Sequence, residues 1–141
     1  MAEEASVPSI SPATPPFKPK RPPTNSFCFA SIPVADSSRA QSFYKAVFTW
    51  TFWTPPGASV TVFHTGGEIM GSFSTRAKDY APAAGGITLY TMVEDVDLTL
   101  QKIVEAGGTV EKDKFIEGGH TEMALYRDTE GNLGGILHWL I

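Results

Sequence analysis

One pattern of residues occurs twice in this chain. A short apolar stretch ending in Val34-Ala35-Asp36 precedes a helical pattern, and a similar stretch ending in Val93-Glu94-Asp95 precedes another. Each copy then continues into three strand-like stretches separated by turns rich in glycine or proline. A repeated strand–helix–three-strand unit within 141 residues predicts two small modules. Ligand cavities commonly lie where two such modules meet, so a functional site is expected there.

The first 24 residues differ in composition from the rest of the chain. Seven prolines fall between positions 8 and 23, among Ser, Ala, Thr and Lys. Such a segment buries too little apolar area to offset the entropy of ordering, which predicts a disordered arm over 1–24. A Pro-x-x-Pro ligand for another domain is the alternative interpretation. The remainder, 25–141, is predicted to be one domain, with module one at 25–75, a linker at 76–85 and module two at 86–141.

The helical patterns place apolar residues on one face of each helix. In the first helix the stripe begins at Ala40 and ends at Phe48, and Asp36 is placed to cap the N-terminus. The second helix has Asp95 or Asp97 as its cap, and Gly107-Gly108 provides the turn that ends it. These helices and the strands around them predict an α+β fold.

Composition excludes several classes of function. The formal net charge of −4 argues against a nucleic-acid partner, since such proteins carry a basic surface. One cysteine, Cys28, excludes an internal disulfide, and no apolar leader is visible, so a cytoplasmic protein is expected. No stretch approaches the roughly 20 apolar residues that a membrane span requires.

Three motifs resemble those of a known superfamily. They are Ile-Pro-Val-Ala-Asp-x-x-Arg-Ala-x-x-Phe-Tyr-x-x-Val-Phe at 32–48, Val-x-Asp-Val-Asp with Ala-Gly-Gly at 93–108, and Arg-Asp-Thr-Glu-Gly-Asn at 127–132. Together they resemble the glyoxalase, bleomycin-resistance and dioxygenase superfamily, also called vicinal oxygen chelate proteins, and within it a branch related to lactoylglutathione lyase. The resemblance implies two βαβββ modules whose mixed sheet is curved and partly closed around a cavity, with the helices outside.

The resemblance also implies a divalent metal held by two side chains from each module. Carried onto this chain, the four ligand positions are Phe29, Thr88, Gly71 and Gly135. None of them offers an imidazole or a carboxylate, and one neutral hydroxyl cannot hold a transition metal. We therefore expect no metal and no other cofactor. A different ligand cluster remains an alternative, formed by His64, Glu68, His120 and Glu122.

The alternation of the strands suggests what lines the cavity instead. The side chains expected to contact a ligand are mostly apolar or aromatic, with a few polar groups: Phe29, Ser31, Thr88, Phe73, Leu137, Trp139 and His64. The alternative is that Phe29 and Trp139 fill the space as core. For proton transfer, the candidates are the neighbouring pair His120 and Glu122 and the hydroxyl of Tyr90.

Three functions fit this description. The first is a metal-independent isomerase, cyclase or lyase acting on a small hydrophobic or aromatic molecule of secondary metabolism. The second is a non-catalytic protein that binds and sequesters such a molecule, and the third is an interaction module whose cavity is filled. Ordinary lactoylglutathione lyase activity is disfavoured, because that reaction depends on a metal. The resemblance further implies a homodimer.

Overall fold

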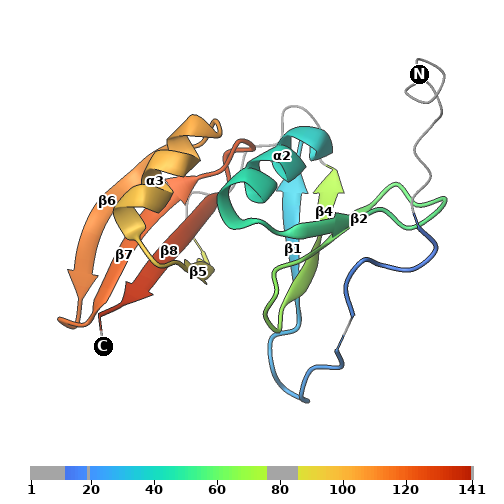
Figure 1. The fold of residues 1–141 in the computed structure, drawn as a ribbon, viewed down its shortest axis with the longest axis horizontal. Helices are drawn as coiled ribbons and strands as arrows, with labels where there is room; N and C mark the ends of the chain where they lie inside the picture. The colour runs from blue at the N-terminus through green and yellow to red at the C-terminus, as the bar shows by residue number, and fades with distance from the viewer. Residues whose placement is uncertain (1–11, 19, 76–85, 141) are drawn as a thin grey trace.

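The computed structural model describes residues 12–18, 20–75 and 86–140 (Figure 1). The predicted linker at 76–85 and the first eleven residues of the arm lie outside the described residues. The elements follow one another as β1 (Phe29–Val34), α2 (Ser37–Phe48), β2 (Thr51–Trp53), β3 (Thr61–His64), β4 (Met70–Thr75), β5 (Tyr90–Met92), α3 (Val96–Glu105), β6 (Thr109–Glu117), β7 (Thr121–Arg127) and β8 (Leu133–Trp139). The predicted α+β class and the repeated βαβββ order are confirmed.

Each module forms its own four-stranded mixed sheet. The strand orders are β1-β4-β3-β2 and β5-β8-β7-β6, so the two sheets are hydrogen-bonded separately and neither closes into a barrel. In each sheet the first strand pairs in parallel with the last strand of its module, and the other pairs are antiparallel. As a result, β1 and β5 are both end strands with one open edge.

The helices begin at the predicted capping residues. The Asp36 carboxylate accepts a hydrogen bond from Arg39 N at 3.0 Å, and the Asp95 carboxylate accepts one from Leu98 N at 2.9 Å. Each bond satisfies a backbone N–H group that has no partner within the helix. Helix α3 is followed by Gly107 at φ +100°, a conformation that side chains resist.

The two faces of each sheet differ in what covers them. The inner faces carry Phe63, Phe73, Ala124 and Ile136, all at most 2% exposed, and they pack under the helices. The opposite faces, here called the outer faces, point away from α2 and α3. Strand pairing places on the outer face of module one Phe29, Ser31, Met70, Ser72, Val62, His64 and Trp53, and on that of module two Tyr90, Met92, Leu137, Trp139, Met123, Leu125 and Phe115.

Hydrogen bonds from a turn of module two connect the two modules. This turn, 128–132, joins β7 to β8 and reaches the start of α2. The Glu130 carboxylate accepts hydrogen bonds from the backbone N–H groups of Ala35 at 2.9 Å and Asp36 at 3.0 Å, and from Arg39 Nε at 2.7 Å. Asn132 Nδ2 donates to Pro33 O at 2.7 Å. The motif at 127–132 therefore fixes how module two sits against β1 and α2.

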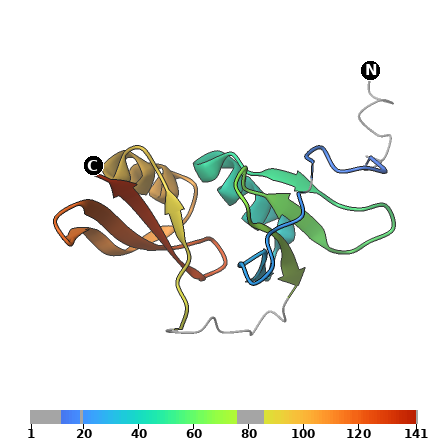
Figure 2. The same cartoon turned by 90° about the horizontal axis from the view of Figure 1, so that it is seen from below.

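The described part of the N-terminal arm lies on the outer face of module one. Trp53 Nε1 donates to Pro12 O at 2.8 Å, and the Phe17 ring stacks on His64 with centroids 4.9 Å apart. Residues 12–18 and 20–24 contain no helix or strand. Figure 2 shows this segment passing across the front of module one before it joins β1.

Among the described residues, no helix combines the length and the apolar character needed to cross a lipid bilayer.

Candidate functional site

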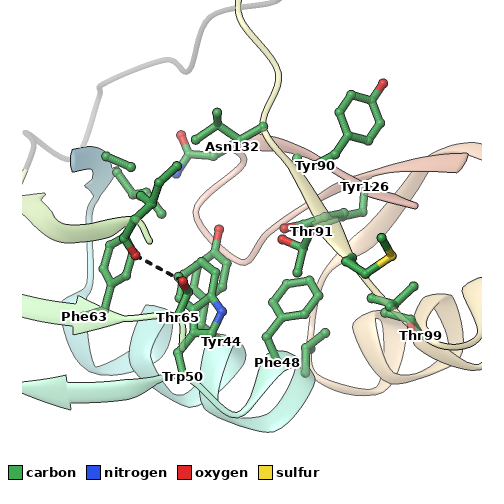
Figure 3. Close-up of a pocket in the computed structure, with 18 of the residues that line it drawn as sticks. Tyr44, Phe48, Trp50, Phe63, Thr65, Tyr90, Thr91, Thr99, Tyr126 and Asn132 are labelled. Carbon is green, nitrogen blue, oxygen red and sulfur yellow. Dashed lines mark hydrogen bonds between the residues drawn. The ribbon is translucent and has the colours of Figure 1, made fainter. Parts of the chain in front are cut away.

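A cleft of about 850 Å³ lies between the two modules (Figure 3). Its walls are β1 and the β3–β4 turn on one side, and β5 with the first turns of α3 on the other. Figure 3 shows Trp50 and Phe63 on the module-one side and Tyr90 and Thr91 across from them. The cleft therefore needs both modules, as expected for a site at the junction of a repeat.

The base of the cleft is a stack of aromatic rings. The rings of Tyr44 and Trp50 are nearly parallel, with centroids 4.5 Å apart, and Trp50 stacks in turn on Phe63 at 4.7 Å. Phe48 lies against Trp50, with centroids 5.7 Å apart, and against Tyr126 at 6.0 Å. Tyr44 and Phe63 are buried, so the aromatic surface at the cleft is mainly that of the partly buried Phe48 and Trp50, which the stack beneath them holds in place.

Polar groups lie beneath and around these rings. The Tyr44 hydroxyl donates to Asp128 Oδ2 at 2.7 Å, and both residues are buried. Burial raises the pKa of Tyr44 well above its ordinary value, and the neighbouring Tyr126 and Asp128 raise it further. Burial also raises the pKa of Tyr126. Both phenols are therefore neutral at physiological pH and can act as hydrogen-bond donors.

Burial likewise acts on the Asp128 carboxyl and raises its pKa. Hydrogen bonds from Tyr44, Asn132 and the Glu130 backbone oppose that shift without cancelling it. Asp128 is the first residue of the turn that holds the modules together, and its carboxylate links the backbone of that turn, at Glu130 and Asn132, to Tyr44 at the base of the cleft.

Only two of the predicted site residues line the cleft. Ser31 lies on β1 and Tyr90 on β5, at opposite walls. Tyr90 is 37% exposed, and its ring lies over Gly135. The predicted ligand contacts Phe29, Thr88, Leu137, Trp139 and His64 are not among the lining residues.

Those five residues are placed elsewhere. Phe29 and Trp139 lie on the outer faces and are 57% and 59% exposed, so the alternative in which they fill a core is wrong. Leu137 shares the outer face of module two, and His64 stacks against Phe17. Thr88 precedes β5, which begins only at Tyr90.

The prediction that Phe73 shares a face with Phe29 is wrong. Strand β4 pairs Phe29 with Met70 and Ile32 with Phe73, so Phe73 points to the inner face, where it is 2% exposed. It packs against Phe63 and Tyr44 in the core. A shift of one residue in the assumed register reversed its face.

His120 and Glu122 do not meet at the cleft. They lie at the end of β7 remote from Tyr126, which is the β7 residue that lines the cleft. Glu122 faces Lys114 with 3.7 Å between the charged atoms, and His120 Nδ1 lies 3.3 Å from the Thr121 hydroxyl. No hydrogen bond joins the two predicted partners among the described residues. Neither His120 nor Glu122 lines the cleft, so this pair is not placed to contact a ligand bound there.

The residues at the four metal positions do not fit a metal. Gly71 faces inward, where an added Cβ would meet the Phe63 ring and Ala30 O, and an added Cβ at Gly135 would meet the Tyr90 ring. With the register corrected, the outer-face neighbours of Phe29 are Met70 on β4 and, one strand further, His64. A single imidazole remains on that face and no carboxylate, which is too few ligands for a bound transition metal.

The alternative ligand cluster is not assembled. Within residues 12–18, 20–75 and 86–140, no group of three or more His, Cys, Asp or Glu side chains is close enough to hold an ion. His64 and His120 lie in different modules, so His64, Glu68, His120 and Glu122 do not converge.

Sequence reasoning missed most of the cleft. Tyr44 and Phe48 belong to the apolar stripe of α2, which the pattern assigned to the core, and Trp50, Phe63 and Tyr126 carried no separate signal. The one available clue was the accumulation of aromatic residues between positions 43 and 53.

Comparison with known proteins bears on the fold. No family model matches the chain. A glyoxylase-like domain-containing protein from Didymella fabae is 29% identical over 111 residues, which cover 74% of this chain and 87% of that protein. A crystal structure of a glyoxalase/bleomycin resistance protein/dioxygenase family enzyme from Burkholderia phytofirmans PsJN superimposes with a TM-score of 0.67 at 20% identity, covering 79% of this chain and 97% of that one.

The chain has the vicinal oxygen chelate fold. A further structure with this fold is the fosfomycin resistance protein FosX from Mesorhizobium loti, with a TM-score of 0.62 and 12% identity over 82% of this chain and 92% of that one. The resemblance drawn from the three motifs is thereby confirmed at the level of a glyoxalase-like homologue and of the vicinal oxygen chelate fold.

Proposed function

We propose that this protein binds a small, flat and mostly apolar molecule in the cleft between its two modules, without a metal ion at the positions the superfamily uses. The main support for the proposal is the cleft of about 850 Å³, whose base is formed by the stacked rings of Tyr44, Trp50 and Phe63. Pockets for drug-sized ligands have volumes of roughly 300–1,000 Å³ and are lined mainly by apolar and aromatic side chains. The cleft matches both properties.

The polar groups of the cleft favour orientation of a ligand over chemical conversion. The Tyr44 hydroxyl already donates its one proton to Asp128, and burial keeps the phenol of Tyr126 protonated, so neither group is suited to act as a base. Of the two carboxylates that line the cleft, Asp95 is engaged in capping α3, and Glu94 is an exposed side chain at the rim. Binding is therefore better supported than an isomerase, cyclase or lyase reaction.

Both resistance proteins and enzymes share this fold. One neighbour is a fosfomycin resistance protein and another is described as a glyoxalase/bleomycin resistance protein/dioxygenase family enzyme. Sequestration of a hydrophobic compound requires an apolar cleft and no reactive group. We propose sequestration as the role of this protein, with a metal-independent conversion of the same molecule as the alternative.

A fragment screen by saturation-transfer NMR tests the proposal. Flat aromatic fragments should bind the wild-type protein, and Thr91→Trp should abolish binding by filling the cleft. Ile116→Trp is the matched control, because Ile116 is 57% exposed on β6 and does not line the cleft. Equal binding by both variants would contradict the proposed site.

A further inference from the structure

Both walls of the cleft are strand edges. Four consecutive residues of β1, Ala30 to Pro33, line one wall, and consecutive residues from Leu89 to Asp95 line the other. Side chains of a strand alternate between faces, so a strand with one face toward the cleft would contribute every second residue. Strands β1 and β5 are end strands of their sheets, and they present their open edges to the cleft.

The hydrogen bonds of β1 show which of its backbone groups point into the cleft. In a parallel pair the N–H and C=O of one residue point to the partner strand, and those of the next residue point away. Cys28 O accepts from Met70 N on β4 at 3.4 Å, whereas Pro33 O accepts from Asn132 Nδ2 on the opposite side. Ser31, two residues before Pro33, therefore directs its backbone groups to the open edge.

The hydrogen bonds of β5 also show which of its backbone groups point into the cleft. Leu89 O accepts from Gly135 N at 3.0 Å and Val93 N donates to Leu137 O at 2.8 Å, so Leu89, Thr91 and Val93 face β8. Tyr90 and Met92 alternate with them and direct their N–H and C=O groups to the open edge. Among the described residues, no hydrogen bond reaches the backbone groups of Ser31, Tyr90 or Met92 on that side. The two β5 positions are spaced about 7 Å apart, as successive rungs of a ladder are.

We infer that the ligand of the cleft is peptide-like: an extended amide backbone that pairs with Tyr90 and Met92 on β5 and places an apolar side group on the aromatic base. An exposed strand edge is a template for a further strand, and main-chain pairing of this kind recognises extended peptides. The inference rests on the proposed function, because it needs the cleft to be the binding site.

The shape of the cleft favours a single short segment over a second folded copy of the chain. The edge of β5 faces the edge of β1 across the cleft, and α2 with its aromatic residues closes the base. A segment paired with β5 would have β1 as its neighbour on the other side, which favours one extended segment over a strand that carries its own sheet. A volume of 850 Å³ accommodates a few residues.

A pair of synthetic peptides tests the inference. The probe is acetyl-Val-Phe-Val-Phe-amide, and the matched analogue carries N-methyl groups on the two amides that face β5. Binding, measured by NMR titration of the ¹⁵N-labelled protein, should shift the amide signals of Tyr90 and Met92, and N-methylation should weaken it at least tenfold. A version with free termini shows whether the natural source is a small peptide or an internal segment of a longer chain.

Two protein variants separate backbone pairing from side-chain contact. Met92→Pro removes an outward N–H group together with the Met92 side chain, and an edge strand tolerates the missing N–H, as Pro33 on β1 shows. Met92→Ala keeps that group. The loss of one hydrogen bond of about 0.5–1.5 kcal/mol corresponds to roughly two- to tenfold weaker binding by Met92→Pro. Because Met92→Ala also loses the side chain that lines the cleft, Met92→Pro is compared with Met92→Ala, and the same factor should separate the two variants.

Several results would overturn the inference. Equal binding of the two peptides, or equal loss in both Met92 variants, would show that the backbone edge is not used. A dimer that Met92→Pro converts to a monomer would show that a second copy occupies the edge. If aromatic fragments still bind in the cleft in these cases, the proposed function stands and only the peptide-like ligand is wrong.

Discussion

Arg39 and Glu130 are 91 residues apart in the chain, yet Arg39 Nε lies 2.7 Å from Glu130 Oε2. Glu130 is 1% exposed in its side chain and also accepts the first N–H groups ahead of α2. Negative charge at a helix N-terminus is favourable, because it faces the positive end of the helix dipole. One carboxylate thus joins the modules and sets the geometry of the cleft between them.

Replacing Glu130 by Gln should lower the free energy of unfolding by about 1.5–3 kcal/mol, the typical contribution of hydrogen bonds to a charged group. Burial alone would raise the pKa of Glu130, but hydrogen bonds from Arg39, Asp36, Ala35 and Thr129 lower it from its ordinary 4.5. A lowered pKa contributes stability above the ordinary value and loses it as the pH falls through the folded-state value. Urea titrations should therefore show the largest difference between wild type and Glu130→Gln at neutral pH. A difference that does not change with pH would contradict this account.

Replacing Tyr44 by Phe should cost about 1–3 kcal/mol of unfolding free energy, because it removes the hydroxyl that donates to the buried Asp128 carboxylate. Burial raises the pKa of Asp128 and the Tyr44 hydrogen bond opposes that rise, so the variant should raise this pKa further. A carboxyl with a raised pKa is destabilising when charged, and the penalty disappears once it is protonated. Tyr44→Phe should therefore lose less stability at acidic pH than at neutral pH. Tyr90→Phe is the control, expected to change stability by less than about 0.5 kcal/mol.

Replacing Gly134 by Ala should destabilise the protein by about 1–3 kcal/mol through overpacking. An added Cβ at Gly134 would lie 2.6 Å from the Tyr126 hydroxyl, and the Tyr126 ring cannot move without displacing the base of the cleft. At Gly67 the nearest atom, Thr65 Oγ1, would be 3.7 Å away, an ordinary contact. Thermal unfolding should separate Gly134→Ala from a nearly neutral Gly67→Ala, and equal effects would show that the rings repack freely.

Purified protein should contain no stoichiometric zinc, nickel, manganese or iron, and a chelator should leave both its unfolding midpoint and its fragment binding unchanged. The reason is the donor set: phenylalanine, threonine and glycine at the four superfamily positions. Elemental analysis by mass spectrometry is the measurement. One equivalent of a transition metal that the chelator removes together with ligand binding would contradict the proposal.

Local chemistry made the helices and strands predictable. Asp36 and Asp95 cap their helices 59 residues apart, as the repeat predicts, because a cap depends on residues a few positions away. Equivalent residues of the last two strands of each module are separated by a different number of positions. Phe63 pairs with Gly71 and Tyr126 pairs with Gly134, each pair displaced by 63 residues between modules. Counting from the turn glycines therefore matched Gly71, which faces inward, with Gly135, which shares the outer face with Tyr90.

The cleft itself could not be predicted from periodicity. The pattern identifies the apolar face of α2, but not that Phe43 and Phe48 of this helix also contact Tyr126 of module two. That packing turns the open edges of β1 and β5 toward each other and leaves the outer faces exposed. The sites predicted on the outer faces followed from strand alternation, which contains no information on how two sheets are placed in space.

The most direct test maps where a small aromatic ligand binds on the ¹⁵N-labelled protein. We expect the amide shifts that a fragment causes to cluster at β1, the start of α3, and Trp50 and Thr91, and to be the same with and without a chelator. Shifts confined to Phe29, Leu137 and Trp139 on the outer faces, or binding that appears only when a divalent metal is added, would contradict the account.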